Sequence, residues 1–393
     1  MDGGICMYRV GKEEVEAVSR VVASGSYFKT NNVYNETEQA ENDLKKLFDV
    51  KRTLVMTSGM AALVSGMTAL GIGPGDQVIV PAYTYIATAM AVVSVGAIPV
   101  IAEVDETLTI DPEDVEKKIT PATKAIVPVH ILGFPCNMDA ICSIAKKHHL
   151  KIVEDACQAD GARYHGKRLG SIGDAGALSF NVYKLISTGE GGALLTNDEA
   201  LYQRALIYHD SNAVAFFGNQ MEGIKEELFC GAEYRTNEIQ AAMLREQLKK
   251  MDDIIKSIRG IKGKIMEALK DDFKFVPSND ITGDLATTIA FSFDSEEEAR
   301  SFAEKNKETC SLPIDTGKHV YKHWTPIMKK RGAYHPLMDP FKMEANKNIV
   351  PDYQEDMCPK TLDLLSKTVY IGTYDMTEEQ IAEFVENCRE AKK

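Results

Sequence analysis

The residues of this chain whose types and spacing predict chemistry are a lysine and an aspartate, each just after a short apolar run. Lys184 ends the stretch Ser179-Phe180-Asn181-Val182-Tyr183-Lys184, and a segment of mostly small residues follows at 187–192. Asp155 lies twenty-nine residues earlier, at the end of a run that begins at Ile152. An amine that forms a Schiff base and an acid that keeps a pyridine nitrogen protonated are the groups that pyridoxal 5'-phosphate (PLP) requires. The pair therefore predicts PLP chemistry, with Lys184 and Asp155 as catalytic residues.

Both residues also have simpler interpretations. Most lysines lie on the surface, but Phe180 and Val182 beside Lys184 indicate burial, and an unpaired buried ammonium group is costly. Asp155 could instead cap a following helix, a common role for aspartate after a strand. The sequence leaves the cap and the cofactor roles about equally open. In the cofactor interpretation Gln158, one helical turn further on, reaches the phenolic oxygen of the ring.

A second pattern predicts a site for a phosphate group. Thr57-Ser58-Gly59-Met60 follows an apolar run and precedes a helix-like segment, and backbone N–H groups at a helix start bind anions. Ser179 is a second candidate phosphate ligand. Tyr85 follows another predicted strand and could stack on a ring, although aromatic residues at such places more often belong to the core. Such turns are common, so this signal is weak by itself.

Short apolar runs alternate with helix-like segments between residues 54 and 195. This alternation predicts an α/β fold with a mostly parallel central sheet flanked by helices. Ligands of such sheets bind at the carboxyl ends of the strands, and each candidate residue follows directly after an apolar run. The runs 177–180 and 193–195 are predicted to pair as a hairpin.

The pattern changes near residue 250. We expect a large α/β domain over residues 1–250, with an N-terminal helix over 10–24, and a smaller α+β domain over 251–393. Helices are predicted separately over 237–251 and 256–269, and no element could be assigned within 312–360. These boundaries divide a chain that is too long for one simple core.

Composition narrows the class of protein. The 393 residues include 58 acidic and 45 basic ones, a net charge of −13, which disfavours nucleic acids and anionic membranes as partners. Eight cysteines without a CxxC pair indicate a reducing compartment, so we expect a cytoplasmic protein. The uncharged stretch 78–102 contains Pro81, Gly96 and Pro99, which favours a strand–helix–strand unit over a membrane span.

Motifs for other chemistries are poor. The glycines of Gly71-Ile72-Gly73-Pro74-Gly75 do not have the GxGxxG spacing of nicotinamide-binding proteins. In addition, Pro74 disfavours the helix start that this motif requires. His319 and His323 have the i,i+4 spacing of some metal ligands, but a packed or surface pair is the better interpretation. We therefore predict no metal site.

Taken together, these pieces resemble the DegT/StrS family of sugar aminotransferases, which are fold type I PLP enzymes. The resemblance spans roughly residues 10–390 and is most specific in 57–63, 81–88, 154–159, 173–192 and 234–242. It implies that Lys184 carries the cofactor aldehyde and that Asp155 partners the pyridine nitrogen. Other residues that it implies hold the cofactor are Ser58, Gly59, Met60 and Ser179 at the phosphate, Gln158 at the ring hydroxyl, and Tyr85 on the ring face.

The resemblance also implies a reaction and partners. The amino donor would be glutamate or glutamine, and the acceptor a keto or aldehyde sugar in cell-surface polysaccharide or secondary-metabolite biosynthesis. The enzyme would be a homodimer whose active sites are shared. The segment 319–324 is similar to enzymes that aminate a free acidic sugar, 8-oxo-Kdo, in lipopolysaccharide synthesis, so His319 and Tyr321 are candidate substrate residues. A PLP-binding regulatory protein and a PLP-dependent sugar dehydratase remain alternatives, although Lys184 argues against the dehydratase.

One departure from the family concerns Glu233. The chain has Glu233-Tyr234-Arg235 where the family commonly has Asn-Tyr-Arg, and that Asn reaches the cofactor phosphate across the dimer. A carboxylate beside a phosphate would be repulsive. Glu233 therefore points elsewhere, is neutralised, or serves a substrate amine.

Overall fold

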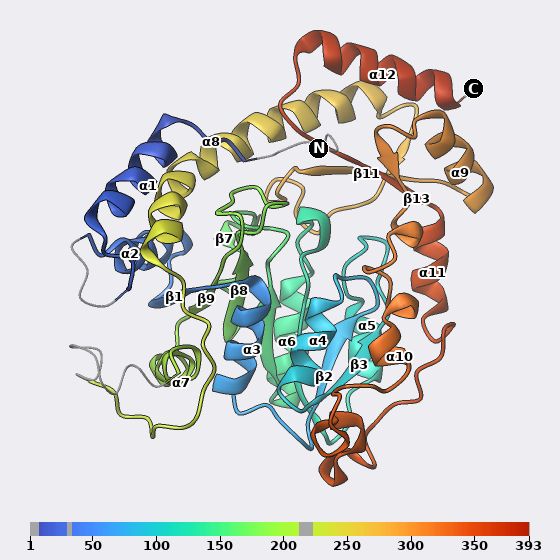
Figure 1. The fold of residues 1–393 in the computed structure, drawn as a ribbon. Helices are drawn as coiled ribbons and strands as arrows, with labels where there is room; N and C mark the ends of the chain where they lie inside the picture. Colours follow the sequence, from blue (N-terminus) through green and yellow to red (C-terminus); the bar gives the residue numbers. More distant parts are fainter. Residues whose placement is uncertain (1–7, 30–33, 212–222, 393) are drawn as a thin grey trace.

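The computed structural model describes residues 8–29, 34–211 and 223–392, which form a large and a small β-sheet with helices packed on both (Figure 1). The large sheet has seven strands, and all its neighbouring pairs are parallel except the two that involve β9. The predicted mostly parallel sheet and the pairing of 177–180 with 193–195 are thus confirmed. Its strands, in spatial order, are β1 (Arg52–Met56), β9 (Gly192–Thr196), β8 (Ala175–Ser179), β5 (Lys151–Asp155), β4 (Thr123–Ile126), β2 (Gln77–Pro81) and β3 (Ile98–Ala102).

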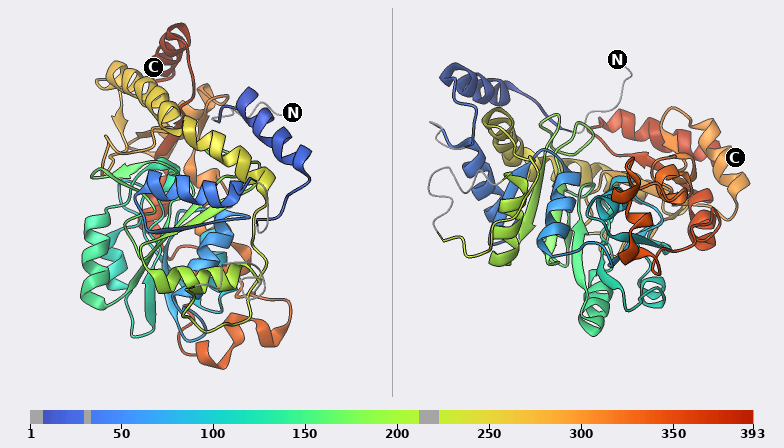
Figure 2. Two further views of the ribbon diagram at one scale, coloured as in Figure 1. Left: turned by 90° about the vertical axis from the view of Figure 1, so that its left-hand side faces the viewer. Right: turned by 60° about the horizontal axis from the view of Figure 1, so that its bottom comes forward.

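Both faces of this sheet are buried, which explains the uninterrupted apolar runs in the sequence. Alternate residues of one strand point to opposite layers: Val78 and Val80 pack in one hydrophobic cluster and Ile79 in the other. The first cluster includes residues of α3 (Gly59–Ala69), α4 (Ala87–Ser94) and α7 (Glu199–His209). The second includes residues of α2 (Glu36–Phe48), α5 (Pro112–Lys117), α6 (Met138–His148) and the first half of α8 (Glu238–Leu269) (Figure 2).

The stretch 78–102 forms β2, α4 and β3, as the strand–helix–strand interpretation predicted. Among the described residues, no helix has the length and apolar character needed to cross a membrane.

The small sheet is antiparallel, and its buried side chains continue the hydrophobic cluster on one face of the large sheet. Its order is β10 (Lys274–Phe275), β11 (Thr288–Ser292), β13 (Thr368–Gly372) and β12 (Cys310–Ser311), with α9 (Glu296–Lys305) and α12 (Glu378–Lys392) packed nearby. The rings of Phe273, Phe291 and Phe302 meet at centroid distances of 5.0, 5.3 and 5.6 Å. The smaller α+β portion expected from the sequence is therefore present.

Helix α8 differs from the prediction because it is one helix of 32 residues, where two were expected. Its buried residues continue without a break through Met251, Ile254, Ile255 and Ile258. It packs against α1 (Lys12–Ser24), the N-terminal helix predicted over 10–24, and against α12 (Figure 1). The expected domain boundary at 250/251 lies inside α8, so the division at that point remains a prediction.

The segment 312–360 consists of short helical turns that lie against the large sheet. Its elements are η4 (Pro313–Asp315), η5 (Tyr321–His323), α10 (Thr325–Met328), η6 (Pro336–Met338), η7 (Pro340–Lys342) and η8 (Glu344–Asn346). Val320 forms a β-bridge with Tyr83, and the amide of Thr84 donates to the carbonyl of His319 at 2.9 Å. The chain just after β2 therefore contacts this distant segment.

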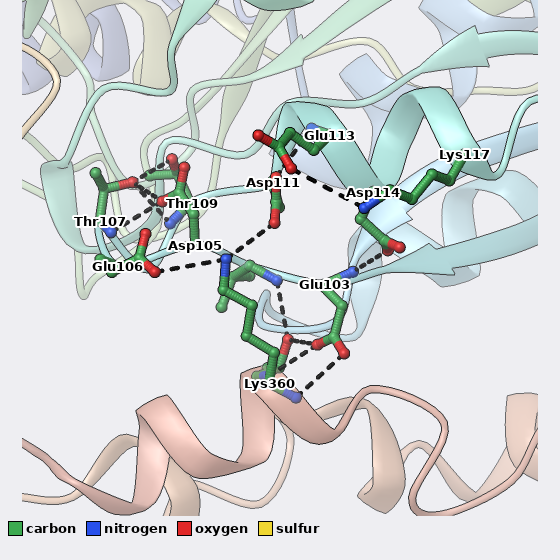
Figure 3. Close-up of polar contacts among 12 residues, drawn as sticks. Glu103, Asp105, Glu106, Thr107, Thr109, Asp111, Glu113, Asp114, Lys117 and Lys360 are labelled. Carbon is green, nitrogen blue, oxygen red and sulfur yellow. Dashed lines mark hydrogen bonds and ion pairs between the residues drawn. The ribbon is translucent and has the colours of Figure 1, made fainter.

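Acidic residues after β3 hold the start of α11 (Pro359–Ser366), as Figure 3 shows. Glu103 Oε2 accepts from the amide of Thr361 at 2.8 Å, and Lys360 Nζ lies 3.0 Å from Asp111 Oδ2. Carboxylates at a helix N-terminus stabilise it, because they meet unpaired N–H groups and the positive end of the helix dipole. This contact fixes the C-terminal part of the chain against the large sheet.

Candidate active site

Asp155 is held rigidly at the end of β5. Only 6% of the residue is exposed. Its Oδ2 accepts from the hydroxyl of Thr88 at 2.8 Å, and its Oδ1 accepts from the amide of Cys157 at 3.2 Å. Residues 156–162 form turns, so the helix that Asp155 would have capped does not exist. The structure thus removes the alternative interpretation of this residue, and its two hydrogen bonds stabilise an oriented carboxylate.

Lys184 follows β8 in a loop and is partly buried. Its positive charge acts on groups from two segments: Cys157 and Asp160 in the turn after β5, and His319. The negative charge of Asp155 acts on the first two of these groups as well. The lysine and the aspartate predicted from the sequence are therefore brought to one place at the carboxyl ends of β5 and β8.

The candidate phosphate ligands also lie together. Ser58 is the N-cap of α3, and its Oγ accepts from the amide of Ala61 at 3.0 Å. A Cβ added at Gly59 would lie 2.5 Å from Cys157 Sγ and 3.0 Å from Ser179 Cβ, so the helix start packs closely on the ends of β5 and β8. Within the part of the chain that the structure describes, the amides of Gly59 and Met60 have no acceptor.

Helix amides without a partner and serine hydroxyls are the donors that a phosphate group requires. Together with a lysine amine and an oriented carboxylate, they fit PLP. We refer below to Ser58, Gly59, Met60 and Ser179 as the phosphate cradle.

Gln158 and Tyr85 border the same region. Gln158 Oε1 accepts from the amide of Leu132 at 3.1 Å, which directs the NH₂ group of this side chain away from that contact. Tyr85 is 43% exposed, its ring centroid lies 5.6 Å from that of His319, and Lys318 Nζ lies 5.4 Å from its ring. Their roles at the cofactor ring remain predictions.

His319 and Tyr321 have different environments. Burial and the charge of Lys318 lower the pKa of His319 to about 4, and its Nδ1 is buried with no partner among the described residues. His319 thus presents a neutral imidazole beside Tyr85. Tyr321 is fully buried, donating to the carbonyl of Glu355 at 2.6 Å and accepting from the amide of Cys358 at 3.1 Å. Because its hydroxyl is used within the core, these contacts do not support a substrate role for Tyr321, which stays a prediction.

Glu233 is neutralised within its own chain. Its Oε2 accepts from Arg235 Nη2 at 2.6 Å and from Ser211 Oγ at 3.1 Å. Arg235 Nη1 also donates to Asp210 Oδ1 at 2.8 Å. Of the three explanations offered for the departure from Asn, the structure favours neutralisation.

Sequence reasoning missed three residues around the site. Thr88 lies in the segment 81–88 that resembled the family, but its contact with Asp155 depends on how β2 and β5 are placed. Asp160 is buried among Ser179, Asp155 and Lys184, and its acidic side chain five residues after Asp155 was the one signal available.

Glu154 is the third missed residue. It is fully buried and accepts from the amides of Gly170, Ile172 and Gly173 at 2.9, 2.6 and 2.6 Å. His130 Nε2 lies 3.2 Å from its Oε2, and His130 Nδ1 accepts from the amide of Cys136 at 3.1 Å. This network anchors β5 directly before Asp155.

Comparisons with known proteins agree with this geometry. A dTDP-3-amino-3,6-dideoxy-alpha-D-galactopyranose transaminase from Aneurinibacillus thermoaerophilus is 38% identical over 324 residues, which cover 80% of this chain and 85% of that protein. The spore coat polysaccharide biosynthesis protein SpsC of Bacillus subtilis is 38% identical over 66% of this chain and 67% of that protein. The crystal structure of DesV from S. venezuelae superposes with a TM-score of 0.76 at 29% identity, over 97% of this chain and 94% of that chain. Residues 9–389 match the model of the DegT/DnrJ/EryC1/StrS aminotransferase family. The chain belongs to this family of PLP-dependent aminotransferases, whose named relatives include sugar transaminases.

Proposed function

We propose that this enzyme transfers the amino group of glutamate or glutamine to a keto or aldehyde carbon of a sugar. A nucleotide-linked acceptor is supported by the relative named as a dTDP-sugar transaminase, and a role in cell-surface polysaccharide synthesis by the relative named for spore coat polysaccharide. A free acidic sugar such as 8-oxo-Kdo is the second acceptor to test, because Lys318 places a positive charge beside Tyr85.

In this proposal each residue near the cradle has a distinct role. The phosphate cradle binds the cofactor phosphate, and bound PLP supplies an electron sink for negative charge at the substrate carbon. Lys184 would hold the cofactor at its aldehyde carbon, and its free amine would take and return the proton at the substrate Cα. Asp155 holds a proton at the ring nitrogen, and Thr88 fixes its orientation. Gln158 donates to the ring hydroxyl, and Tyr85 covers one face of the ring.

The observation that carries this proposal is the convergence of Lys184 and Asp155 on Cys157 and Asp160, next to the start of α3. An amine, an oriented carboxylate and an anion site on three strand ends are the parts that an aminotransferase needs. Burial alone would not bring these three kinds of group together.

Absorption spectroscopy tests the proposal. The protein reconstituted with PLP should show the visible band of the lysine-bound cofactor, lose it on addition of glutamate or glutamine, and regain it with the correct keto sugar. Lys184→Ala should abolish the band and turnover, whereas Lys256→Ala, an exposed lysine on α8, should change neither. A band that no donor removes would instead indicate a regulatory protein. Loss of a sugar hydroxyl without gain of an amine would indicate a dehydratase.

We further infer a homodimer that completes the site. Tyr183, directly before Lys184, is 77% exposed, and its neighbour Val182 is 42% exposed. Exposed apolar side chains next to a catalytic lysine are expected to be covered by a partner. Light scattering should give twice the mass of the chain, and Tyr183→Asp should shift the population toward the monomer. A wild-type protein that is monomeric at micromolar concentration would refute this inference.

A further inference from the structure

A second carboxyl group, that of Asp160, is buried next to the phosphate cradle. Asp160 is 2% exposed, and its Oδ1 accepts from the amide of Ser179 at 3.3 Å. Among the described residues this is the one hydrogen bond that the Asp160 side chain makes. Ser179 thus contacts Asp160 through its amide while its side chain packs against Gly59 at the start of α3.

Asp160 and Asp155 lie in different environments five residues apart. Asp155 receives two hydrogen bonds, from a hydroxyl at 2.8 Å and an amide at 3.2 Å, whereas Asp160 receives one long bond from an amide. Burying a charged carboxylate with only one long hydrogen bond is unfavourable in free energy, so this environment favours the uncharged acid. Burial, as the largest cause, and the charge of Asp155 raise the pKa of Asp160 to about 8, against the opposing effects of the Lys184 charge and the Ser179 amide.

No other nearby charge reverses this balance. Cys157 lies between Asp155 and Asp160, and burial raises the pKa of its thiol well above the usual value, so it stays neutral. The guanidinium of Arg168 donates to the backbone carbonyl of Gly161. Its Nη2 also lies 2.6 Å from Asp252 Oδ1, so its charge is already paired. The surroundings of Asp160 are thus one ammonium, one carboxylate and a neutral thiol, with a guanidinium that is already paired.

We propose that Asp160 is a proton-coupled positioning residue whose carboxyl group must be uncharged for the cofactor phosphate to bind beside Ser179. This inference rests on the cradle assigned under the proposed function. A phosphate dianion next to Ser179 would meet a second negative charge if Asp160 were ionised, in a buried place where the repulsion is weakly screened. The charge of a bound phosphate would therefore hold the proton on Asp160 more tightly in the loaded enzyme.

Cofactor binding should therefore weaken as the pH rises above 8. We suggest pyridoxamine 5'-phosphate as the probe, because it forms no bond with Lys184, and a comparison of the wild-type chain with Asp160→Asn. For one group that titrates near pH 8, the ratio of the wild-type to the variant dissociation constant should rise by about 30-fold between pH 7 and pH 9.5. Because both proteins bind the same probe, the pH dependence that comes from ionisation of the probe cancels in this ratio of dissociation constants. Asp253→Asn, an exposed aspartate on α8, is the matched control and should follow the wild type.

A stability measurement without cofactor gives an independent readout in another pH range. The folded-state pKa of Asp160 lies above that of the unfolded chain, so the wild type loses stability as the pH rises from about 4 to 8, with no further loss above it. The advantage of Asp160→Asn in unfolding free energy should grow over this range and then stay constant. Asp160→Ser, which also lacks a titrating group, replaces the Asn variant if that variant does not fold.

Two results would overturn the inference in distinguishable ways. A dissociation-constant ratio that stays constant from pH 6.5 to 9.5 would refute the role of Asp160 and leave the cradle intact. Failure of both proteins to bind the probe at any pH would refute the cradle, and the inference about Asp160 with it.

Discussion

The buried carboxylate of Glu154 should be among the most sensitive positions in the fold. Glu154→Gln keeps the shape of the side chain and replaces one carboxylate oxygen by an NH₂ group. Each oxygen of Glu154 now accepts from two donors: Oε1 from the amides of Ile172 and Gly173, and Oε2 from Gly170 and His130. His130 cannot adapt by moving its proton, because its Nδ1 already accepts from an amide.

The magnitude follows from counting the contacts that change. Whichever oxygen becomes an amide nitrogen, two buried N–H groups lose their acceptor and face a donor instead. Each buried donor left without a partner costs about 1 to 3 kcal/mol, so we expect Glu154→Gln to lower the unfolding free energy by about 2 to 6 kcal/mol. Because Asp155 is the next residue on β5, the variant should also bind PLP more weakly.

Urea unfolding with two independent probes is the assay, with Glu116→Gln as the matched control. Glu116 is a partly exposed carboxylate paired with Lys147 and His148, and exposed pairs contribute about 0 to 1 kcal/mol. Equal losses for the two variants, or a loss below about 1 kcal/mol for Glu154→Gln, would refute the reasoning that this network anchors the strand.

Three further changes have defined outcomes. Lys262→Met leaves Asp284 without its 2.5 Å partner in the core and should cost about 3 to 5 kcal/mol in chemical denaturation, a loss that the added change Asp284→Leu should reduce. Tyr321→Phe should lower the unfolding free energy by about 1 to 3 kcal/mol and leave the KM for the acceptor unchanged, whereas a raised KM would support its substrate role. Thr88→Val removes the hydroxyl that orients Asp155, so the dissociation constant for PLP should rise by about tenfold; an unchanged constant would show that this contact is dispensable.

Periodicity predicted the large sheet well because its strands are buried on both faces. Such strands appear as continuous apolar runs, and all five residues of β2, Gln77–Pro81, are buried. The expectation of two helices between 237 and 269 was wrong for a local reason. Asp252 and Asp253 are both exposed, so they lie on the solvent side of α8 and do not interrupt its buried stripe.

The segment 312–360 could not be assigned because its conformation depends on distant partners. Asn346 Nδ2 donates to the carbonyl of Gly96 at 2.9 Å, and the hydroxyl of Tyr353 donates to that of Pro99 at 2.6 Å. Irregular chain is stabilised by such side-chain contacts to backbone groups. A pattern read along the sequence does not contain the position of these carbonyls.

The candidate site likewise contains residues that the sequence could identify and one whose role it could not. Lys184, Asp155 and Ser58 could be found because each follows a strand, and β1, β5 and β8 run in the same direction, so their ends meet at one edge of the sheet. Asp160 could not be assigned a role, because its burial depends on a turn that returns the chain to the amide of Ser179.

The two carboxyl groups that follow β5 therefore lie in different hydrogen-bonding environments. β5 is anchored by Glu154, and the next residue, Asp155, finds a hydroxyl and an amide that stabilise its carboxylate. The turns that follow place Asp160 against β8 with a single long hydrogen bond, which favours the uncharged acid. If both groups were ionised, two negative charges would face a cofactor that itself carries a phosphate dianion. In the proposed enzyme, this difference would place a carboxyl group that accepts two hydrogen bonds at the ring nitrogen and an uncharged acid beside the phosphate.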